Sequence, residues 1–207
     1  VLQHDIGRAL FYNGRAQPRR GLLPEYGLDG VDRSLLVPAI KEILTNENGW
    51  ARSTLSGWVY PILTAAEREL LWGDIYQATR YIAPSGIMFA SGNRTHGLKL
   101  MAEHHIKEGL ELAAWYVRYQ KGHGNKRRVP DALTSLLLYG AHAKTVIPEL
   151  ESHAKWYKAK RNPRHGVRDD DPATRIREAI KKIEAMPEPP PFELISIGGT
   201  LGETRQD

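Results

Sequence analysis

The spacing of the apolar residues, which recur at three- and four-residue steps, is the feature that most constrains the fold. Such stripes occupy residues 34–46, 64–82, 98–105, 110–117, 133–137, 146–157 and 172–183. These steps place side chains on one face of an α-helix, whereas a half-buried strand needs an apolar residue at every second position. No convincing alternation of the second kind precedes residue 190. The sequence therefore predicts an all-α fold.

Residues that start or stop helices flank several of these stripes. Thr64 and Glu67 have the spacing of a capping box, in which each side chain binds a backbone amide at the helix start. Asp171, followed by proline, is a strong N-cap, and Gly140 suits a left-handed C-terminal cap. The predicted helices are 10–18 residues long and are joined by short loops.

Internal repetition distinguishes a stack of helical hairpins from a simple bundle. Residues 36–40 and 146–150 share a pattern with proline in the first helical turn, and they lie 110 residues apart. That distance is about three units of 36 residues, the length of two-helix repeats in solenoids. We therefore expect an α-solenoid of irregular helical hairpins, with a non-repeating helical bundle as the alternative.

A resemblance to HEAT-like repeats supports the first alternative. Residues 139–150 resemble the inter-helix turn and second helix of such repeats. Together with residues 28–32, 83–92 and 105–109, they resemble the C-terminal helical region of large, uncharacterised multidomain bacterial proteins. The resemblance covers roughly residues 10–160 and brings no catalytic motif. It implies that the chain, which begins with Val1, is one part of a longer polypeptide.

The expected organisation is a single HEAT-like helical domain at 1–186 and a Pro/Gly-rich C-terminal tail at 187–207. An irregular, glycine- and proline-rich connection is expected at 13–30 within the domain. The tail begins with a stiff proline-rich linker, and its residues 192–197 suit one short extended segment.

Composition and missing motifs exclude several functional classes. The chain has no cysteine, which excludes disulfides, cysteine-ligated zinc, iron–sulfur clusters and a thiol nucleophile. It has no apolar run long enough to span a membrane, and it has no Gly-x-Ser-x-Gly motif. His96, Glu103, His104 and His105 do not have the spacing of a metal-binding helix, so we expect no metal or other cofactor. The sequence does not assign a compartment, and both the bacterial cytoplasm and secretion stay open.

One candidate binding loop covers residues 84–94, before a predicted helix. Ser91, Asn93 and Arg94, with neighbouring glycines, can hold an anion or a carboxylate at a helix N-terminus. The alternative is that Ser91 or Asn93 only caps the helix while the glycines form the turn.

Charge is concentrated in residues 121–168, which contain 11 basic and 3 acidic residues. This block can meet a polyanion, either a nucleic acid or an acidic glycan. Its candidate ligand-binding residues are Lys126, Arg127, Arg128, Lys158 and Arg161. The alternative is a solvated basic surface, neutralised in part by the three aspartates at 169–171.

Five tryptophans and several tyrosines offer a second surface hypothesis. They can line a carbohydrate-binding groove, or they can occupy equivalent packing positions between helices. Trp72, Trp115 and Trp156 are about 42 residues apart, close to a repeat length, which favours packing.

These observations favour a non-catalytic scaffold or interaction domain, whose partner is another protein or the remainder of the parent chain. The first alternative is a nucleic-acid-binding protein that uses the basic block, as HEAT-like DNA glycosylases use a basic concave face. The second is an accessory domain of a polysaccharide-active protein.

Overall fold

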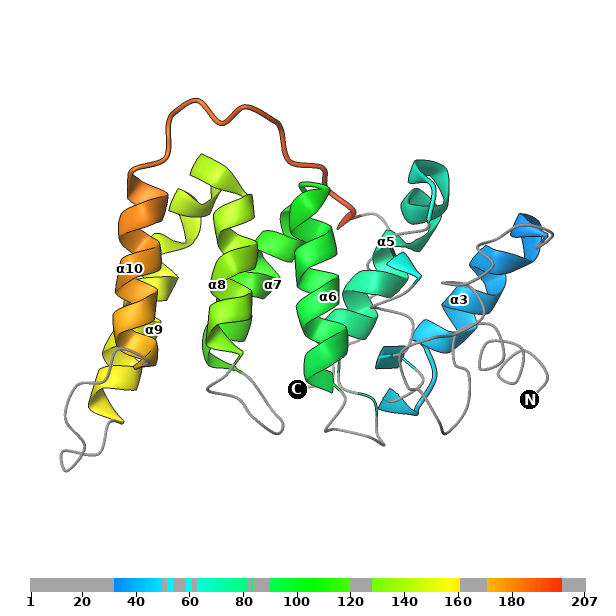
Figure 1. Ribbon diagram of the computed structural model, residues 1–207, viewed down its shortest axis with the longest axis horizontal. Helices are drawn as coiled ribbons and strands as arrows, with labels where there is room; N and C mark the ends of the chain where they lie inside the picture. Colours follow the sequence, from blue (N-terminus) through cyan, green and yellow to red (C-terminus); the bar gives the residue numbers. More distant parts are fainter. Residues whose placement is uncertain are drawn as a thin grey trace, which may run out of the picture. The chain divides into compact units, whose positions relative to one another are not determined.

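The computed structural model describes residues 32–49, 52–53, 59–60, 63–81, 83, 90–119, 128–160 and 171–198. The regular elements in these ranges are helices, and none of the described residues belongs to a strand (Figure 1). The all-α prediction is therefore confirmed. The chain divides into two compact units: unit 1 is Val1–Gly97 with Gly198–Asp207, and unit 2 is Leu98–Ile197.

Unit 1 contains the 3-10 helix η1 (Arg33–Leu35) and the helices α3 (Leu36–Leu44) and α5 (Ala65–Arg80), and α6 (Ala90–Glu103) begins in it. The predicted capping box starts α5. The Glu67 amide donates to Thr64 Oγ1 at 3.2 Å, and the Thr64 amide donates to the Glu67 carboxylate at 2.8 Å.

The buried faces of α3 and α5 pack against each other. They carry Leu36, Ile40, Ile43 and Leu44 on α3 and Leu71, Ile75 and Ala78 on α5. Two predicted core positions are wrong, because Leu35 is 66% exposed and Leu70 is 62% exposed. Leu35 belongs to η1 rather than to the buried face of α3, and Leu70 lies one residue, or about 100°, from the buried line of α5.

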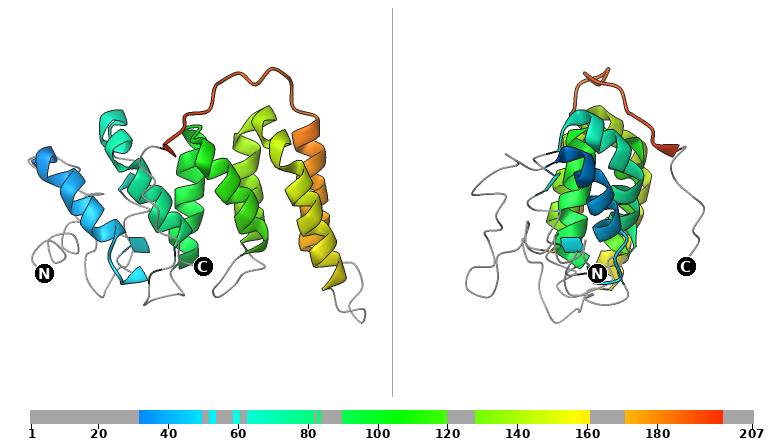
Figure 2. Two further views of the ribbon diagram at one scale, coloured as in Figure 1. Left: turned by 180° about the vertical axis from the view of Figure 1, so that it is seen from behind. Right: turned by 90° about the vertical axis from the view of Figure 1, so that its right-hand side faces the viewer.

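Unit 2 contains two helical hairpins. Their elements are α7 (Lys107–Arg118), α8 (Val129–Leu138), the 3-10 helix η5 (Gly140–Val146), α9 (Ile147–Ala159) and α10 (Pro172–Glu184). Helix α7 packs against α8 and α9, while α10 packs against α9 and α8 (Figure 2). Helices α7 and α9 therefore lie side by side in one layer and run in the same direction, with α8 and α10 in the other layer.

The predicted caps of unit 2 are observed. Gly140 has φ +60°, the left-handed conformation that glycine adopts without strain. The Asp171 carboxylate accepts from the amide of Thr174 at 3.3 Å at the start of α10. Of the three leucines expected on the apolar stripe of α8, Leu133 and Leu136 are buried and Leu137 is only half-buried.

The corner between α6 and α7 differs from the prediction, which placed His105 on a helical stripe. Helix α6 ends at Glu103, and His105 has φ +58°. The amide of Ile106 donates to the carbonyl of Met101 at 2.8 Å, and that of His105 donates to Ala102 at 3.1 Å. This is the hydrogen-bond pattern of a Schellman motif, so the chain turns at His105 and starts α7.

The segment after α10 returns to this corner (Figure 1). We call residues 187–197 the strap. Its residue Ile195 forms an isolated parallel bridge with Ile106, so the expected extended segment at 192–197 makes one bridge and no strand. The predicted division into a domain at 1–186 and a tail at 187–207 stays a prediction, and the expected connection at 13–30 lies outside the described residues.

Among the described helices, none combines the length and the apolar composition that crossing a bilayer requires.

Candidate functional site

Aromatic and basic side chains gather where α7 and α9 end. We call this group the aromatic–arginine cluster, and it consists of Trp115, Arg118, Tyr119, His153, Trp156 and Tyr157. The two helices are parallel neighbours, so their last turns lie at the same end of unit 2.

The guanidinium of Arg118 lies at the centre of the cluster. Its Cζ atom is 4.9 Å from the ring centroid of Tyr119 and 4.9 Å from that of Trp156. Trp115 stacks on Tyr119 with ring centroids 5.4 Å apart. Among the described residues, no ion pair joins Arg118 to a carboxylate, and cation–π contacts are its observed interactions.

Tyr119 supplies the exposed surface of the cluster. Tyr119 is 42% exposed, whereas Trp115, Trp156 and Tyr157 are half-buried. The Tyr157 hydroxyl donates to the carbonyl of Val117 at 2.9 Å, which satisfies a carbonyl in the last turn of α7. Burial raises the pKa of Tyr157, so its hydroxyl stays a donor at neutral pH.

His153 contacts the ring of Tyr119 and is only 2% exposed. The two rings meet edge to face at 5.9 Å, and His153 Nε2 is 3.2 Å from a Glu149 carboxylate oxygen. Burial lowers the pKa of His153, and Glu149 opposes this effect. The imidazole is therefore neutral at neutral pH and packs against Tyr119.

Exposed basic residues surround this end of unit 2. Lys155, Lys158 and Lys160 are exposed on the last turns of α9 and at its C-cap. In the sequence, the basic stretches 120–127 and 161–168 follow α7 and α9, and they lie outside the described residues. A cation near a helix C-terminus is also favoured by the helix dipole, so part of this charge stabilises the helices.

The structure describes only two of the five candidate ligand-binding residues of the basic block, Arg128 and Lys158. Lys126, Arg127 and Arg161 lie outside the described residues. Arg128 immediately precedes α8 and pairs with Asp131 at 3.4 Å, and Lys158 is exposed on α9. Both described residues therefore lie at or next to the end of unit 2 that carries the aromatic–arginine cluster, and their binding of a ligand stays a prediction.

The other predicted binding residues, Ser91, Asn93 and Arg94, lie in a helix rather than in the expected loop. Helix α6 begins at Ala90, so Ser91, Asn93 and Arg94 are helical, and the expected position before the helix is wrong. Asn93 and Arg94 are both buried. Asn93 Nδ2 donates to the carbonyl of Ala78, and Arg94 donates to those of Thr79 and Arg80, at 2.6–3.0 Å. These side chains cap the C-terminus of α5, whose last carbonyls lack intrahelical partners.

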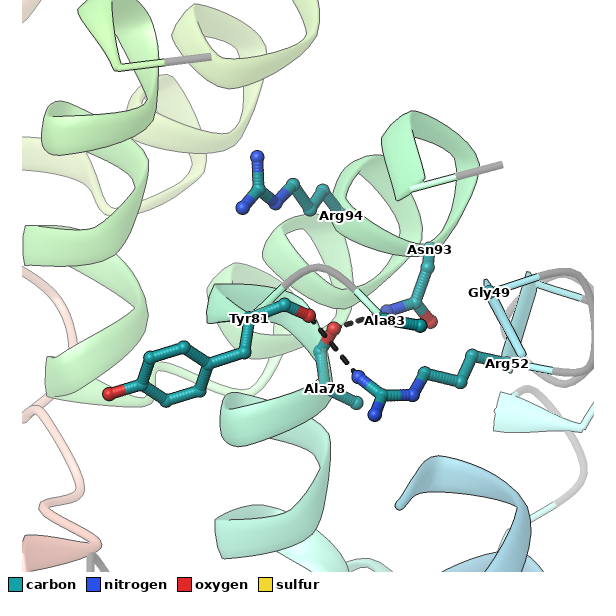
Figure 3. Close-up of a pocket in the computed structure, with 7 residues that line it drawn as sticks. All are labelled: Gly49, Arg52, Ala78, Tyr81, Ala83, Asn93 and Arg94. Carbon is teal, nitrogen blue, oxygen red and sulfur yellow. Dashed lines mark hydrogen bonds between the residues drawn. The ribbon is translucent and has the colours of Figure 1, made fainter. Parts of the chain in front are cut away.

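A small pocket adjoins these caps (Figure 3). Its lining residues are Gly49, Arg52, Ala78, Tyr81, Ala83, Asn93 and Arg94. Arg52 donates to the carbonyl of Asn46 at 2.6 Å and to that of Tyr81 at 3.2 Å. The guanidinium of Arg94 points away from Arg52 (Figure 3). The pocket has room for about one water molecule, so it is too small for a metabolite.

The described aromatic residues outside the cluster do not form an open groove. Tyr60, Trp72, Tyr76 and Tyr116 are buried, while Trp50 and Trp58 lie outside the described residues. The part of the chain that the structure describes contains no group of three acidic or histidine side chains able to hold a metal ion.

The tryptophans of the cluster are among the aromatic residues that the sequence offered for a surface, whereas Arg118 and His153 were not predicted. The signal that was available is a constant offset of 38 residues, which separates Trp115 from His153, Arg118 from Trp156, and Tyr119 from Tyr157. Such an offset is expected when the first helices of two successive hairpins lie parallel. Comparisons with family models, curated proteins and solved structures found no match for this chain.

Proposed function

We propose that this chain is a non-catalytic binding domain whose aromatic–arginine cluster binds single-stranded nucleic acid. The observation that carries the proposal is the position of Arg118, against the rings of both Tyr119 and Trp156 at the end where α9 exposes its lysines. Proteins that bind single strands combine aromatic rings, on which bases stack, with cations that follow the backbone.

The chemistry of the cluster assigns a role to each group. The exposed part of Tyr119 offers a contact surface to a base, and Trp115, Arg118 and buried His153 hold the Tyr119 ring in place. Lys155, Lys158 and Lys160 offer positive charge to phosphates, which neutral glycans lack. An acidic glycan can pair with the lysines through its own anionic groups. It gains less binding free energy from an aromatic ring than a stacked base does.

The packing of unit 2 supports an irregular HEAT-like stack as the scaffold. In such a stack, α7–α8 and α9–α10 are successive hairpins whose first helices pack together and whose second helices pack together. Stacks of this kind build extended interaction surfaces, which also suits a scaffold that binds protein partners. The proposed binding of nucleic acid depends neither on the repeat assignment nor on a longer parent polypeptide.

The test measures anisotropy of a fluorescein-labelled oligothymidylate as the full chain is added at low and at moderate salt. We expect binding at low salt that weakens steeply as salt rises. Tyr119→Ala should weaken binding by roughly 5- to 150-fold, because one stacked base contributes about 1–3 kcal/mol.

A charge-matched pair of variants locates the site. Lys155→Ala/Lys158→Ala removes two positive charges at the cluster end, and Lys181→Ala/Lys182→Ala removes two exposed charges from the last turn of α10, at the other end of the hairpin. Only the first variant should lower the slope of log affinity against log salt, by about 1.4. Equal effects of the two variants, or no binding at low salt, would refute the proposal. Binding of an acidic glycan in place of the oligonucleotide would also refute it.

A further inference from the structure

The strap contacts the rest of unit 2 mainly through its second half (Figure 1). Residues 187–191 include four prolines and are mostly exposed, and an ion pair between Glu188 and Lys144 at 2.6 Å holds them. The backbone of Ile195 then bridges the corner between α6 and α7. Its amide donates to the carbonyl of His105, and its carbonyl accepts from the amide of Lys107, each at 2.9 Å. The bound half is thus joined to α10 by a stiff linker.

Two histidines hold Phe192, the first residue of the bound half. His105 stacks on the Phe192 ring with centroids 3.5 Å apart and planes 5° from parallel. The His142 ring lies 5.3 Å from the same ring, and His142 Nε2 lies 2.7 Å from the carbonyl oxygen of Phe192, to which its N–H donates. The contact between the strap and the corner therefore depends on two imidazoles, and imidazole is the side chain that changes its charge between pH 5 and 8.

A proton has different effects on these two rings. A protonated His142 keeps its N–H donor, so its hydrogen bond to Phe192 survives. The His105 ring makes no hydrogen bond or ion pair with any described residue, so a proton on it gains no partner. The face of Phe192 attracts a cation, but the loss of water and the repulsion from His142 outweigh that attraction. Burial, with His142 as the second cause, accordingly lowers the pKa of His105.

No carboxylate of the described residues compensates a charge on His105. The other charged or titratable side chains around the corner and along the strap come from α6, α7, the C-cap of α8, η5 and the strap itself, and they are Glu103, His104, Lys107, Glu108, Tyr139, Lys144, Glu188 and Glu193. Glu103 pairs with Lys99 at 3.5 Å. Glu188 pairs with Lys144, and no carboxylate pairs with the His105 ring.

Glu108 holds the other end of the bound half. Its carboxylate accepts from Ser196 Oγ at 2.7 Å and from the amide of Ile197 at 3.0 and 3.1 Å. The Ile197 side chain is buried. Protonation of Glu108 would also loosen the strap, so a substitution has to separate this effect from one that begins at His105.

We propose that the strap is a pH-sensitive latch, which is docked while His105 is uncharged and is released when His105 and His142 both carry a proton. Release returns the Phe192 ring and the Lys107 amide to solvent. The latch lies at the opposite end of α7 from the aromatic–arginine cluster, and it does not depend on the proposed function.

The sign of the pH dependence follows from the environment of His105. Its pKa is lower in the docked state than the ordinary value of 6.5 that a released, solvated imidazole has. The contribution of His105 to docking is therefore complete above pH 6.5 and is lost as the pH falls through the lowered pKa. Acid releases the strap, and neutral pH docks it.

Hydrogen exchange of single amides, followed by NMR, measures the release. The amides of Ile195 and Lys107 exchange when the strap leaves the corner, whereas the amide of Leu136, inside α8, exchanges when unit 2 itself opens. We expect the protection factors of Ile195 and Lys107, corrected for the intrinsic exchange rate at each pH, to fall at least about threefold from about pH 7.5 to about pH 5. Leu136 should be more strongly protected than both at every pH.

Four substitutions locate the origin of the fall. His105→Asn should abolish it, because asparagine accepts the left-handed conformation at this position and does not titrate. His142→Gln keeps an N–H donor but removes the charge, so it should make the fall smaller. His104→Gln, at the neighbouring histidine, and Glu108→Gln should both retain it.

Three results would overturn the proposal. The first is a wild-type chain in which the protection of Ile195 and Lys107 does not fall, or in which it equals that of Leu136. The second is a fall that persists in His105→Asn. The third is a fall that disappears in Glu108→Gln, which would place the origin at the carboxylate.

Discussion

Gly97→Ala gives a prediction with an unusual sign. Alanine normally stabilises a helix relative to glycine by about 1 kcal/mol. Gly97 lies within α6, but a methyl group built there would lie 2.0 Å from Thr79 Oγ1 and 3.1 Å from Thr79 Cβ and Cγ2. Thr79 is buried, and its hydroxyl donates to the carbonyl of Ile75 at 2.7 Å, so it cannot turn away without losing that bond.

The magnitude follows from two opposing terms. Overpacking a closely packed site costs about 1–3 kcal/mol, and a 2.0 Å approach to Thr79 belongs at the upper end. After subtraction of the helix term, Gly97→Ala should lower the free energy of unfolding by about 2 kcal/mol. Gly92→Ala, in the same helix, meets no atom within 4 Å and should raise it by up to about 1 kcal/mol.

Urea unfolding of both variants, followed by far-UV circular dichroism and by tryptophan fluorescence, measures the difference. Thr79→Ala in the Gly97→Ala background should restore part of the lost stability, because it removes the closest atom. The reasoning fails if Gly97→Ala stabilises the chain as much as Gly92→Ala does. It also fails if the Thr79 substitution is merely additive.

Three further predictions concern acid stability and the core. Arg33 donates to the Glu67 carboxylate and lowers the pKa of Glu67 to about 2, so this pair stabilises unit 1 above pH 4.5 and loses its effect as the pH falls towards 2. Glu67→Gln should therefore cost up to about 1 kcal/mol at neutral pH and nothing near pH 2, as urea midpoints at several pH values would show. Tyr139→Phe should cost about 1 kcal/mol by the same denaturation assay, since it removes the buried hydrogen bond to the carbonyl of Ile106 at 2.8 Å. Leu136→Ala, at a fully buried position, should cost about 2–5 kcal/mol, and a cost under about 0.5 kcal/mol would contradict the observed register of α8.

Local signals in the sequence predicted local structure well. The capping box at Thr64, the N-cap at Asp171 and the left-handed Gly140 all depend on residues within one turn of the feature that they set. The corner at His105 was not predicted, because a histidine in the left-handed conformation gives no compositional warning. Its conformation is explained by the Schellman hydrogen bonds and by the strap, which lies about 90 residues further along the chain.

The polar residues that looked most like ligand-binding groups show why sites are harder to predict than helices. Asn93 and Arg94 bind carbonyls at the end of α5, and Tyr157 binds a carbonyl in the last turn of α7. The carbonyl of Ile195 satisfies the first amide of α7, that of Lys107. In each case a helix end is satisfied by a group from another element, because every α-helix leaves backbone groups unpaired at both ends. A sequence shows the donor or acceptor but not the distant helix end that uses it. The aromatic–arginine cluster differs in that the guanidinium at its centre binds rings rather than backbone, and for that reason it carries the proposed function.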